Sequence, residues 1–391
     1  MMKRILFHSL TIPPDNVSTG MLVAELAAGF NKNNIEVEIL ASTPQYNFEN
    51  SHSNNLSIID KHFSKSEYKG VKIYHVNSKT RSFKESRRIF QWMRFHYYSL
   101  RFLYKARKTY EHIFIFSYPP TMNLVSIFVY KILKLKVTYS VWELYPEIAN
   151  NLSLFQSRLL SRMFKKLDTY SMKNTDNLVV NSPELRNYLI TNRDLSKKNI
   201  EVITHFSPYA LSENYPNLDL KKMFYAGNLG KPQNLEKFIQ MSIEHDVKWK
   251  FDIYGAGTEY VNIEKYVNAE INLNKHIERN KLIEKISDIP VALISLDERI
   301  TIEGFPGKTF DYLSMNKVLL SISNKDSAVA KFIERHSLGV NIEPNSVKSF
   351  LDAFEKLSSR QFLSETLLNV SNINKNQIKK SEIVKQYLTL I

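Results

Sequence analysis

The sequence predicts an α/β protein made of two Rossmann-like domains. Strand and helix patterns alternate through residues 3–204, and the alternation restarts at residue 222 after a linker that contains Pro208 and Pro216. Strands that alternate with helices favour parallel sheets covered on both faces. A chain of 391 residues also suits two domains of ordinary size better than one.

In the first half, apolar residues at helical spacing predict a helix that Gly20 opens, with Ser18 or Thr19 as its cap. Longer helices are expected at 87–110 and 121–133, and the polar, aperiodic segment 47–69 is expected to be a surface loop. Strands are expected at 3–8, 36–41, 71–76, 112–116, 136–141, 178–181 and 201–204.

The second half repeats this pattern and ends in a separate helix. Its strands are expected at 222–226, 249–254, 291–295, 318–323 and 339–342, with helices at 234–245, from about Lys308, at 327–336 and at 346–357. An apolar face of the last helix predicts that it packs back on the first domain. The predicted organisation is a first domain at 1–205, a hinge at 206–220, a second domain at 221–374 and a returning helix at 375–391.

Composition narrows the function classes. The absence of cysteine excludes disulfides and thiolate metal sites. The N-terminal apolar run is too short for a signal peptide, and no stretch of about 18 apolar residues predicts a membrane span, so a cytoplasmic location is expected. Almost all of the net charge of +14 falls within residues 1–210, which indicates an anionic partner for the first domain.

The segment from Glu303 to Asp311 carries the strongest chemical signal. A turn rich in glycine and proline leads into a helix, where backbone amides favour an anion such as phosphate. Lys308 supplies a cation for a diphosphate, and the two carboxylates suit sugar and ribose hydroxyls. The predicted binding segment also includes Gly304, Phe305, Pro306 and Gly307. A P-loop would require glycine at position 302, which is isoleucine, and an ordinary strand–loop–helix connection is the other alternative.

Two shorter segments could add to such sites. Gly227, Asn228 and Lys231 follow the first strand of the second half, where glycine lets a backbone approach a ligand and the lysine could reach a phosphate. In the first half, Glu143 follows a strand and is a candidate base for an acceptor hydroxyl, whereas Glu147 could instead merely begin the next helix. No histidine pair has metal-ligand spacing, so no metal site is expected.

The helix expected between Arg81 and Lys108 mixes basic and aromatic residues. This combination suits an anionic membrane surface, with Trp92, Phe95 and Tyr98 at the headgroup level. A nucleic acid is a weaker alternative, and a sheet-covering helix with a solvated basic face is a third.

Together these segments resemble the family 4 glycosyltransferases of the GT-B fold, which build bacterial surface polysaccharides. Pro13-Pro14-Asp15 with Gly20 resembles the N-terminal glycine loop of that family, and the segment from Glu143 to Glu147 resembles its Asp-Leu-Trp-Pro-Glu motif. Glu303 and Asp311 match the spacing of its Glu-x7-Glu motif, with aspartate in place of the second glutamate. Asn228 stands where an arginine is often found.

The resemblance implies two domains that face across a cleft and a retaining transfer of sugar from a nucleoside diphosphate without metal or cofactor. It implies that Glu303 contacts the donor sugar, that Asp311 takes the place of the ribose-binding glutamate, and that lysines stabilise the departing diphosphate. The implied acceptor is a polyprenyl-linked or polysaccharide chain, which fits peripheral attachment to the inner membrane face. Two alternatives stay open: a GT-B-fold nucleotide-sugar epimerase and a non-catalytic nucleic-acid-binding protein. The sequence leaves the donor sugar, base, acceptor and linkage undetermined.

Overall fold

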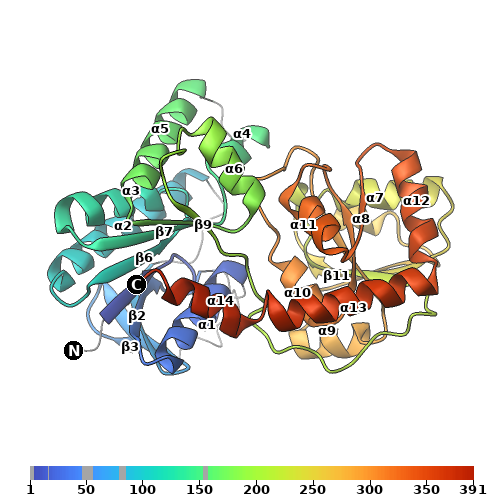
Figure 1. Ribbon diagram of the computed structural model, residues 1–391, viewed down its shortest axis with the longest axis horizontal. Helices are drawn as coiled ribbons and strands as arrows, with labels where there is room; N and C mark the ends of the chain where they lie inside the picture. Colours follow the sequence, from blue (N-terminus) through green and yellow to red (C-terminus); the bar gives the residue numbers. More distant parts are fainter. Residues whose placement is uncertain (1–3, 16, 46–55, 79–84, 153–156) are drawn as a thin grey trace. The chain divides into compact units, whose positions relative to one another are not determined.

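The computed structural model describes residues 4–15, 17–45, 56–78, 85–152 and 157–391. The chain divides into two compact units (Figure 1). Unit 1 comprises Met1–Pro208 together with Lys380–Ile391, and unit 2 comprises Tyr209–Lys379. Each unit has its own sheet, so each is described separately.

Unit 1 is built on a sheet whose order, among the described residues, is β3-β4-β5-β2-β1-β6-β7-β8-β9. All neighbouring pairs are parallel except β3–β4 and β4–β5, which are antiparallel. The strands are β1 Arg4–His8, β2 Glu36–Ser42, β3 Ser57–Ile58, β4 Phe63–Tyr68, β5 Val71–Val76, β6 His112–Phe116, β7 Lys136–Val141, β8 Asn177–Val180 and β9 Ile200–Val202.

Helices cover this sheet, and one of them comes from the end of the chain. The helical elements are α1 Ser18–Lys32, α2 Glu85–Ala106, α3 Met122–Phe128, the π-helix η2 Val129–Leu133, α4 Glu147–Asn151, α5 Arg158–Asn174, α6 Pro183–Asn192 and α14 Lys380–Leu388. In Figure 1, α14 (red) lies beside α1 (blue), which it contacts. Ile383, Val384 and Tyr387 enter the same apolar core as α1 and β1.

Unit 2 contains a parallel sheet of order β12-β11-β10-β13-β14-β15. Its strands are β10 Lys222–Asn228, β11 Lys250–Ala256, β12 Ile271–Asn274, β13 Val291–Ser295, β14 Val318–Ile322 and β15 Gly339–Ile342. Its helices are the 3₁₀-helix η3 Lys231–Gln233, α7 Leu235–Glu244, α8 Tyr260–Glu264, α9 Arg279–Ile286, α10 Lys308–Ser314, α11 Ala328–His336, α12 Val347–Leu357 and α13 Arg360–Asn376. Apolar clusters fill both faces of the sheet, as two-sided cover requires.

Several sequence expectations need correction. The segment 47–69 is not all loop, because β4 pairs with β5 as an antiparallel hairpin; residues 46–55 lie outside the described residues. The first helix begins at Ser18, so Gly20 lies inside it rather than at its start. The returning helix begins at Lys380, because α13 extends to Asn376. β12, α9 and α13 were not predicted.

Candidate functional site

The C-terminal ends of β10 and β11 approach each other so closely that glycine is required. Gly227 pairs with Gly255, and a Cβ on Gly255 would lie 2.2 Å from the Gly227 oxygen. A Cβ on Gly257 would lie 2.2 Å from the Leu229 oxygen. Gly255 and Gly257 therefore serve the packing of the two strand ends. Gly227 differs in two respects. Its φ is positive, which favours glycine, and a Cβ at this position would lie 3.0 Å from the amine of Lys308.

Helix α10 is held against the end of β10 by one side chain. The Tyr312 hydroxyl accepts a hydrogen bond from the Ala226 amide at 2.9 Å and donates one to the Ala226 carbonyl at 3.0 Å. The Tyr312 ring also packs edge-on against Phe224. This clamp explains how residues about 80 positions apart in the sequence, at Gly227 and on α10, come to line one site.

The Lys308 amine is the feature of this site that most clearly indicates an anionic ligand. Its Nζ is buried without a hydrogen-bond partner and stands 3.8 Å from the centre of the Tyr225 ring. Burial lowers the pKa of Lys308 to about 7, and the nearby Asp311 carboxylate opposes this shift only in part. A buried amine with no acceptor is costly, so a ligand oxygen beside Gly227 would satisfy it.

The Glu303 carboxylate is buried and fixed by its own loop. It accepts hydrogen bonds from the Thr301 amide at 2.8 Å and from the Thr301 hydroxyl at 3.2 Å. The next residue but one, Phe305, packs its ring against Phe310 and Phe332. The side chain of Phe305 therefore belongs to the core, so a ligand contact at this residue would have to come from its backbone, and that contact stays a prediction.

The turn after Glu303 offers fewer unpaired amides than the sequence indicated. The Thr309 amide donates to the Pro306 carbonyl and the Phe310 amide to the Gly307 carbonyl. Gly304, Pro306 and Gly307 are partly exposed. The anion-binding capacity of this segment therefore rests more on the Lys308 amine than on the start of α10.

Asp311 has a partner that the sequence did not reveal. Its carboxylate lies 3.9 Å from the guanidinium of Arg279, which in turn stacks on the Tyr209 ring at 3.2 Å. Arg279 begins α9, 32 residues before Asp311, and no local spacing rule links two such helices. Asp311 is partly exposed in this arrangement and lies on the same helix as Lys308.

The segment around Lys231 follows the carboxyl end of β10. Asn228 donates from its side-chain amide to Gln233 at 3.0 Å, and the Tyr225 hydroxyl donates to the Asn228 carbonyl at 2.6 Å. Lys231 is exposed in η3, and its loop packs on the end of β13 through the Pro232 carbonyl. No contact recorded for the described residues joins Lys231 to Lys308, so its role in the same pocket stays a prediction.

In unit 1, the loop after β7 presents Glu143. The Ser117 hydroxyl accepts hydrogen bonds from the Trp142 amide at 3.0 Å and the Glu143 amide at 3.3 Å, which fixes the loop. Burial raises the pKa of the Glu143 carboxyl, opposed by a hydrogen bond from the Tyr145 hydroxyl at 3.4 Å. A carboxylate with a raised pKa is a better proton acceptor near neutral pH, as base catalysis requires.

Glu147 and Gly20 have structural roles. Glu147 accepts hydrogen bonds from the buried Arg193 guanidinium at 2.6 and 2.9 Å. Burial acts to raise the pKa of Glu147, but the bonds and charge of Arg193 outweigh it and hold the pKa low. A Cβ on Gly20 would lie 2.9 Å from the Ile12 amide nitrogen, so glycine lets α1 pack on the loop before it. A substrate contact by Gly20 stays a prediction.

Helix α2 has two different faces. Phe95 is buried and stacks on His8, contrary to its expected headgroup contact. Tyr98 stacks on His62 at 4.3 Å but is only partly buried, so its headgroup contact stays a prediction. The outward face carries exposed basic and apolar side chains instead. These are Arg87, Ile89, Phe90, Met93, Arg94, Tyr97, Arg101, Tyr104 and Lys105. Arg81, Phe83, Lys84 and the Arg88 side chain lie outside what the structure describes.

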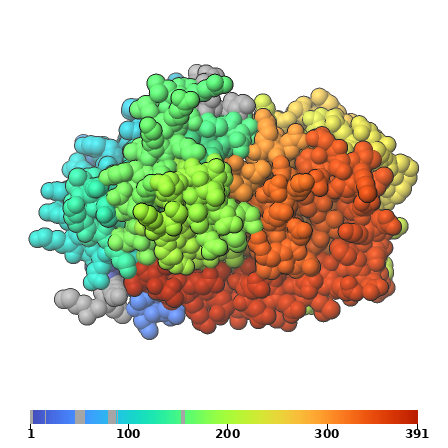
Figure 2. Space-filling view, turned by 45° about the horizontal axis from the view of Figure 1, so that its top comes forward, coloured from blue at the N-terminus to red at the C-terminus, as the bar shows by residue number. Residues whose placement is uncertain are grey.

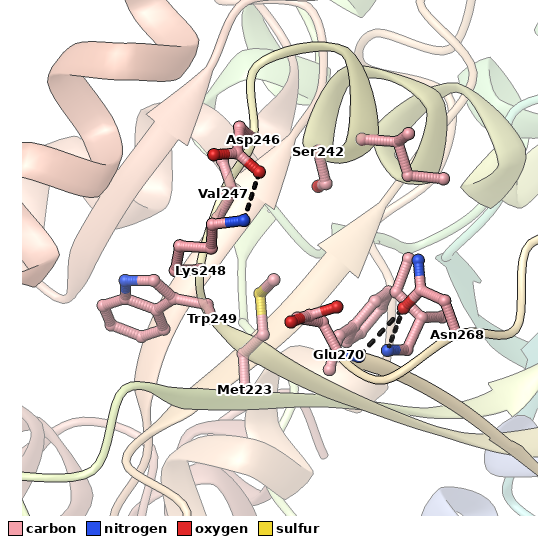
Figure 3. A pocket seen from close by; sticks show the side chains of 11 residues that line it. Met223, Ser242, Asp246, Val247, Lys248, Trp249, Asn268 and Glu270 are labelled. Atoms are coloured by element: carbon pink, nitrogen blue, oxygen red, sulfur yellow. Dashed lines mark hydrogen bonds and ion pairs between the residues drawn. The ribbon is translucent and has the colours of Figure 1, made fainter.

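A separate pocket lies at the opposite end of the unit 2 strands (Figure 3). Met223, Phe251 and Ile271 line it near the starts of β10, β11 and β12, and its volume is about 100 Å³. Asp246 and Lys248 pair with each other at its rim. Ligands of open α/β sheets bind at the carboxyl ends of the strands, so this pocket is not the candidate site. Among the described residues, no group of acidic or histidine side chains could hold a metal ion, and no helix is long and apolar enough to cross a bilayer.

No family model and no curated protein matches the chain, but solved structures match its fold. Sucrose-phosphate synthase from Thermosynechococcus elongatus has a TM-score of 0.75 at 12% identity, covering 99% of this chain and 98% of that one. The catalytic domain of starch synthase IV from Arabidopsis thaliana, bound to ADP and acarbose, has a TM-score of 0.70 at 11% identity, covering 100% and 98%. WaaG, a glycosyltransferase involved in lipopolysaccharide biosynthesis, has a TM-score of 0.64 at 12% identity, covering 99% of each. The chain therefore has the predicted GT-B fold, with two Rossmann-like domains.

Proposed function

We propose that this protein is a retaining glycosyltransferase that uses a nucleoside diphosphate sugar. The observation that carries the proposal is the buried amine of Lys308, which has no hydrogen-bond partner and lies beside Gly227 over the Tyr225 ring. Its helix also carries Asp311 and directly follows the Glu303 turn. A cation, a backbone without a side chain and two carboxylates together suit a diphosphate that links a sugar to a ribose. The likeness in fold to glycosyltransferases supports the same reading.

Each residue then has a distinct task. The Lys308 ammonium stabilises the charge that develops on the departing diphosphate, where a buried cation acts most strongly. Asp311, held by Arg279, accepts hydrogen bonds from the ribose hydroxyls. The Glu303 carboxylate contacts the donor sugar as its anomeric carbon gains positive character. Glu143 of unit 1 removes the proton from the acceptor hydroxyl.

A release assay tests this proposal directly. Nucleoside diphosphate liberated from a panel of nucleotide sugars is measured with and without saccharide and lipid-linked acceptors. Glu303→Gln is expected to lower kcat by at least tenfold with little change in nucleotide affinity, because its contact matters most in the transition state. The matched control Glu355→Gln, at an exposed carboxylate on α12, should behave as wild type.

The outcomes separate the alternatives. Epimerised sugar in the absence of any acceptor would identify an epimerase, and wild-type turnover in Glu303→Gln would refute the assignment of that residue. Failure of every nucleotide sugar to stabilise the fold or to release diphosphate would reject the enzyme class. A ligand at 100 times its dissociation constant should stabilise the protein by about 2.7 kcal/mol, so binding is readily detected.

We also propose that the acceptor is lipid-linked and that unit 1 attaches reversibly to an anionic membrane surface through α2. The outward basic and apolar side chains of α2 support this, because charge attracts the helix to anionic headgroups and apolar side chains then insert between them. Changing Arg87, Arg94, Arg101 and Lys105 together to Gln should weaken sedimentation with anionic vesicles. Equal sedimentation of this variant and wild type would show that α2 serves only to cover the sheet.

A further inference from the structure

Helix α5 leaves large apolar side chains exposed although much of its buried side is polar. Its inward side buries Ser161, Asp168 and Ser171 together with one apolar residue, Met172, whereas Leu159, Leu160 and Met163 are 66%, 57% and 58% exposed on the outward side. Burial of apolar surface is the main stabilising contribution in folding, and large apolar side chains gathered on an exposed face indicate an interaction surface. The outward side of α5 therefore calls for a partner.

The polar contacts on the inward side fix the helix in this orientation. Asp168 accepts hydrogen bonds from Asn123 and Tyr139, both at 3.3 Å, and pairs with Arg193 at 3.5 Å. Ser161 exchanges hydrogen bonds with Asn150 at 2.8 and 3.0 Å. Rotation of α5 to bury its leucines would break these buried bonds, each of which is expensive to lose. The exposed apolar side chains are thus a built-in feature of unit 1.

The same outward side is basic. Arg158, Arg162 and Lys166 are exposed at successive turns, and the one acidic residue within α5 is the buried Asp168. The π-helix η2 adds to this side, because the Lys131 amine lies 5.6 Å from the centre of the Tyr170 ring. Ile132, beside Lys131, is 61% exposed. We call the outward residues Lys131, Ile132, Arg158, Leu159, Leu160, Arg162, Met163, Lys166 and Tyr170 the α5 face.

The α5 face belongs to the same helical layer as α2. Helix α3 contacts both α2 and α5, so the three helices form one side of unit 1 (Figure 1). Figure 2 shows green α5 residues at the surface at the top of that view. We propose that the α5 face is a second membrane-docking surface, which inserts its leucines and methionine among the headgroups of an anionic bilayer while its arginines and lysines pair with lipid phosphates. This proposal rests on the membrane attachment proposed above for α2.

Charge and exposure favour a lipid surface over a protein partner. Each Lys or Arg close to an anionic bilayer strengthens partitioning about fivefold at physiological salt. Three such residues on α5 therefore contribute on the order of a hundredfold. Two copies of the α5 face would instead bring like charges together, which opposes self-association.

Vesicle sedimentation of the full-length protein tests the proposal with two variants. One changes Leu159, Leu160 and Met163 to Ser, and the other changes Arg158, Arg162 and Lys166 to Gln. Both are expected to lower partitioning into phosphatidylserine-containing vesicles by at least tenfold, and only the apolar variant should lose binding that resists high salt. The matched control changes Val347, Leu351 and Leu368 of unit 2, which are 45%, 46% and 64% exposed, to Ser and should bind as wild type.

A label can report insertion independently of total binding. The chain has no cysteine, so Leu160→Cys and the control Leu368→Cys each create a single thiol for an environment-sensitive fluorophore. The emission of the label at position 160 should shift to the blue on addition of phosphatidylserine-containing vesicles and stay unchanged with pure phosphatidylcholine. The label at position 368 should not respond. An unchanged urea unfolding transition in every variant shows that the α5 substitutions leave unit 1 folded.

Three results would overturn the proposal. The first is that both α5 variants sediment with vesicles at wild-type levels while the α2 variant no longer sediments. Membrane attachment would then depend on α2 alone. The second is an unshifted label at position 160 on vesicles that bind the protein. The third is a wild-type dimer in lipid-free solution that the apolar α5 variant converts to a monomer, since the face would then be a contact between two copies. If the wild-type protein released no nucleoside diphosphate, by contrast, the glycosyltransferase proposal would be rejected. The vesicle-binding measurements would still test the α5 face.

Discussion

The Lys308 amine stands where solvent cannot stabilise its charge, so its protonation should be coupled to ligand binding. Its pKa is about 7 in the free protein because burial disfavours the ammonium form. Oxygens of a bound diphosphate would favour the ammonium and raise this pKa again. Below pH 7 the free amine is already charged. Above pH 7 it is mostly neutral and must take up a proton when the diphosphate binds. Affinity for a nucleoside diphosphate should therefore fall as the pH rises above about 7, by at most tenfold per unit.

Titration calorimetry in two buffers of different ionisation enthalpy measures this proton uptake. Lys308→Arg keeps a permanent charge and should bind without proton uptake and with a flat pH profile. Lys308→Met should bind weakly at every pH. An unchanged pH slope in both variants would mean that another group takes up the proton.

The sequence identified most of the site's residue types but not their supports. Glu303, Lys308 and Asp311 lie within nine residues, so their spacing was visible. Tyr312 and Arg279 were missed because their partners, Ala226 and Asp311, lie 86 and 32 residues away. The sequence did not show that the Phe305 side chain packs in the core, because an apolar residue within a turn has the same pattern whether it faces a ligand or the core.

At the scale of single elements, the Tyr312 hydroxyl joins α10 to the end of β10, in addition to the apolar packing of Phe310 and Leu313. Tyr312→Phe removes the acceptor of the Ala226 amide and the donor to its carbonyl. The unpaired backbone groups should cost about 1–3 kcal/mol of unfolding free energy. Nucleotide affinity should fall as well, because Lys308 and Asp311 are on the helix that is released.

Urea unfolding and a nucleotide titration measure the two effects. The control Tyr266→Phe loses a hydroxyl bonded to Glu236 in the same unit, away from α10. It should leave nucleotide affinity unchanged. Unaltered nucleotide affinity in Tyr312→Phe would show that α10 is held mainly by apolar packing.

Helix α5 depends on a second buried anchor, Arg193. The guanidinium pairs with Glu147 and Asp168 and donates to the Lys165 carbonyl and the Thr169 hydroxyl. Arg193→Met would leave the buried Asp168 carboxylate without a cation and Glu147 with Lys165 alone, so it should destabilise unit 1 by about 3–5 kcal/mol.

The pair Lys173–Asp194 supplies the control, since both side chains are substantially exposed. Lys173→Met should cost at most about 1 kcal/mol. Denaturant unfolding of unit 1 distinguishes the two variants. A loss in Arg193→Met as small as in Lys173→Met would mean that the buried carboxylates bind protons instead. Asp168 is the first candidate, because burial raises its pKa to about 7.

Elements with a strong apolar period were predictable, and those without one were not. The strands β10, β13 and β14 are mostly apolar in the sequence, as is typical of parallel central strands. β4 escaped prediction because Phe63–Tyr68 is an edge-side strand in which most of the residues are polar.

At the scale of the whole molecule, the chain's last helix completes the core of its first unit. The buried carboxylate of Glu25 on α1 accepts hydrogen bonds from Lys380 at 2.7 Å and from Tyr68. Ile383, Val384 and Tyr387 are buried in the same core. Unit 1 therefore cannot be complete until residues 380–391 have been made, and the contact between α1 and α14 should contribute to its stability.

Gly29 marks the point where α1 and α14 approach most tightly. A Cβ at Gly29 would lie 2.5 Å from one methyl carbon of Val384 and 3.2 Å from the other, and a β-branched side chain has little freedom to move aside. Gly29→Ala should therefore destabilise unit 1 by about 1–3 kcal/mol, although alanine is the better helix former. Val384→Ala alone should also destabilise by opening a cavity. In the double variant the new methyl group occupies that space, so the loss should be smaller than the sum by at least about 0.5 kcal/mol. Urea unfolding of the four proteins completes the cycle, and additive losses would show that α14 is free to shift away from α1.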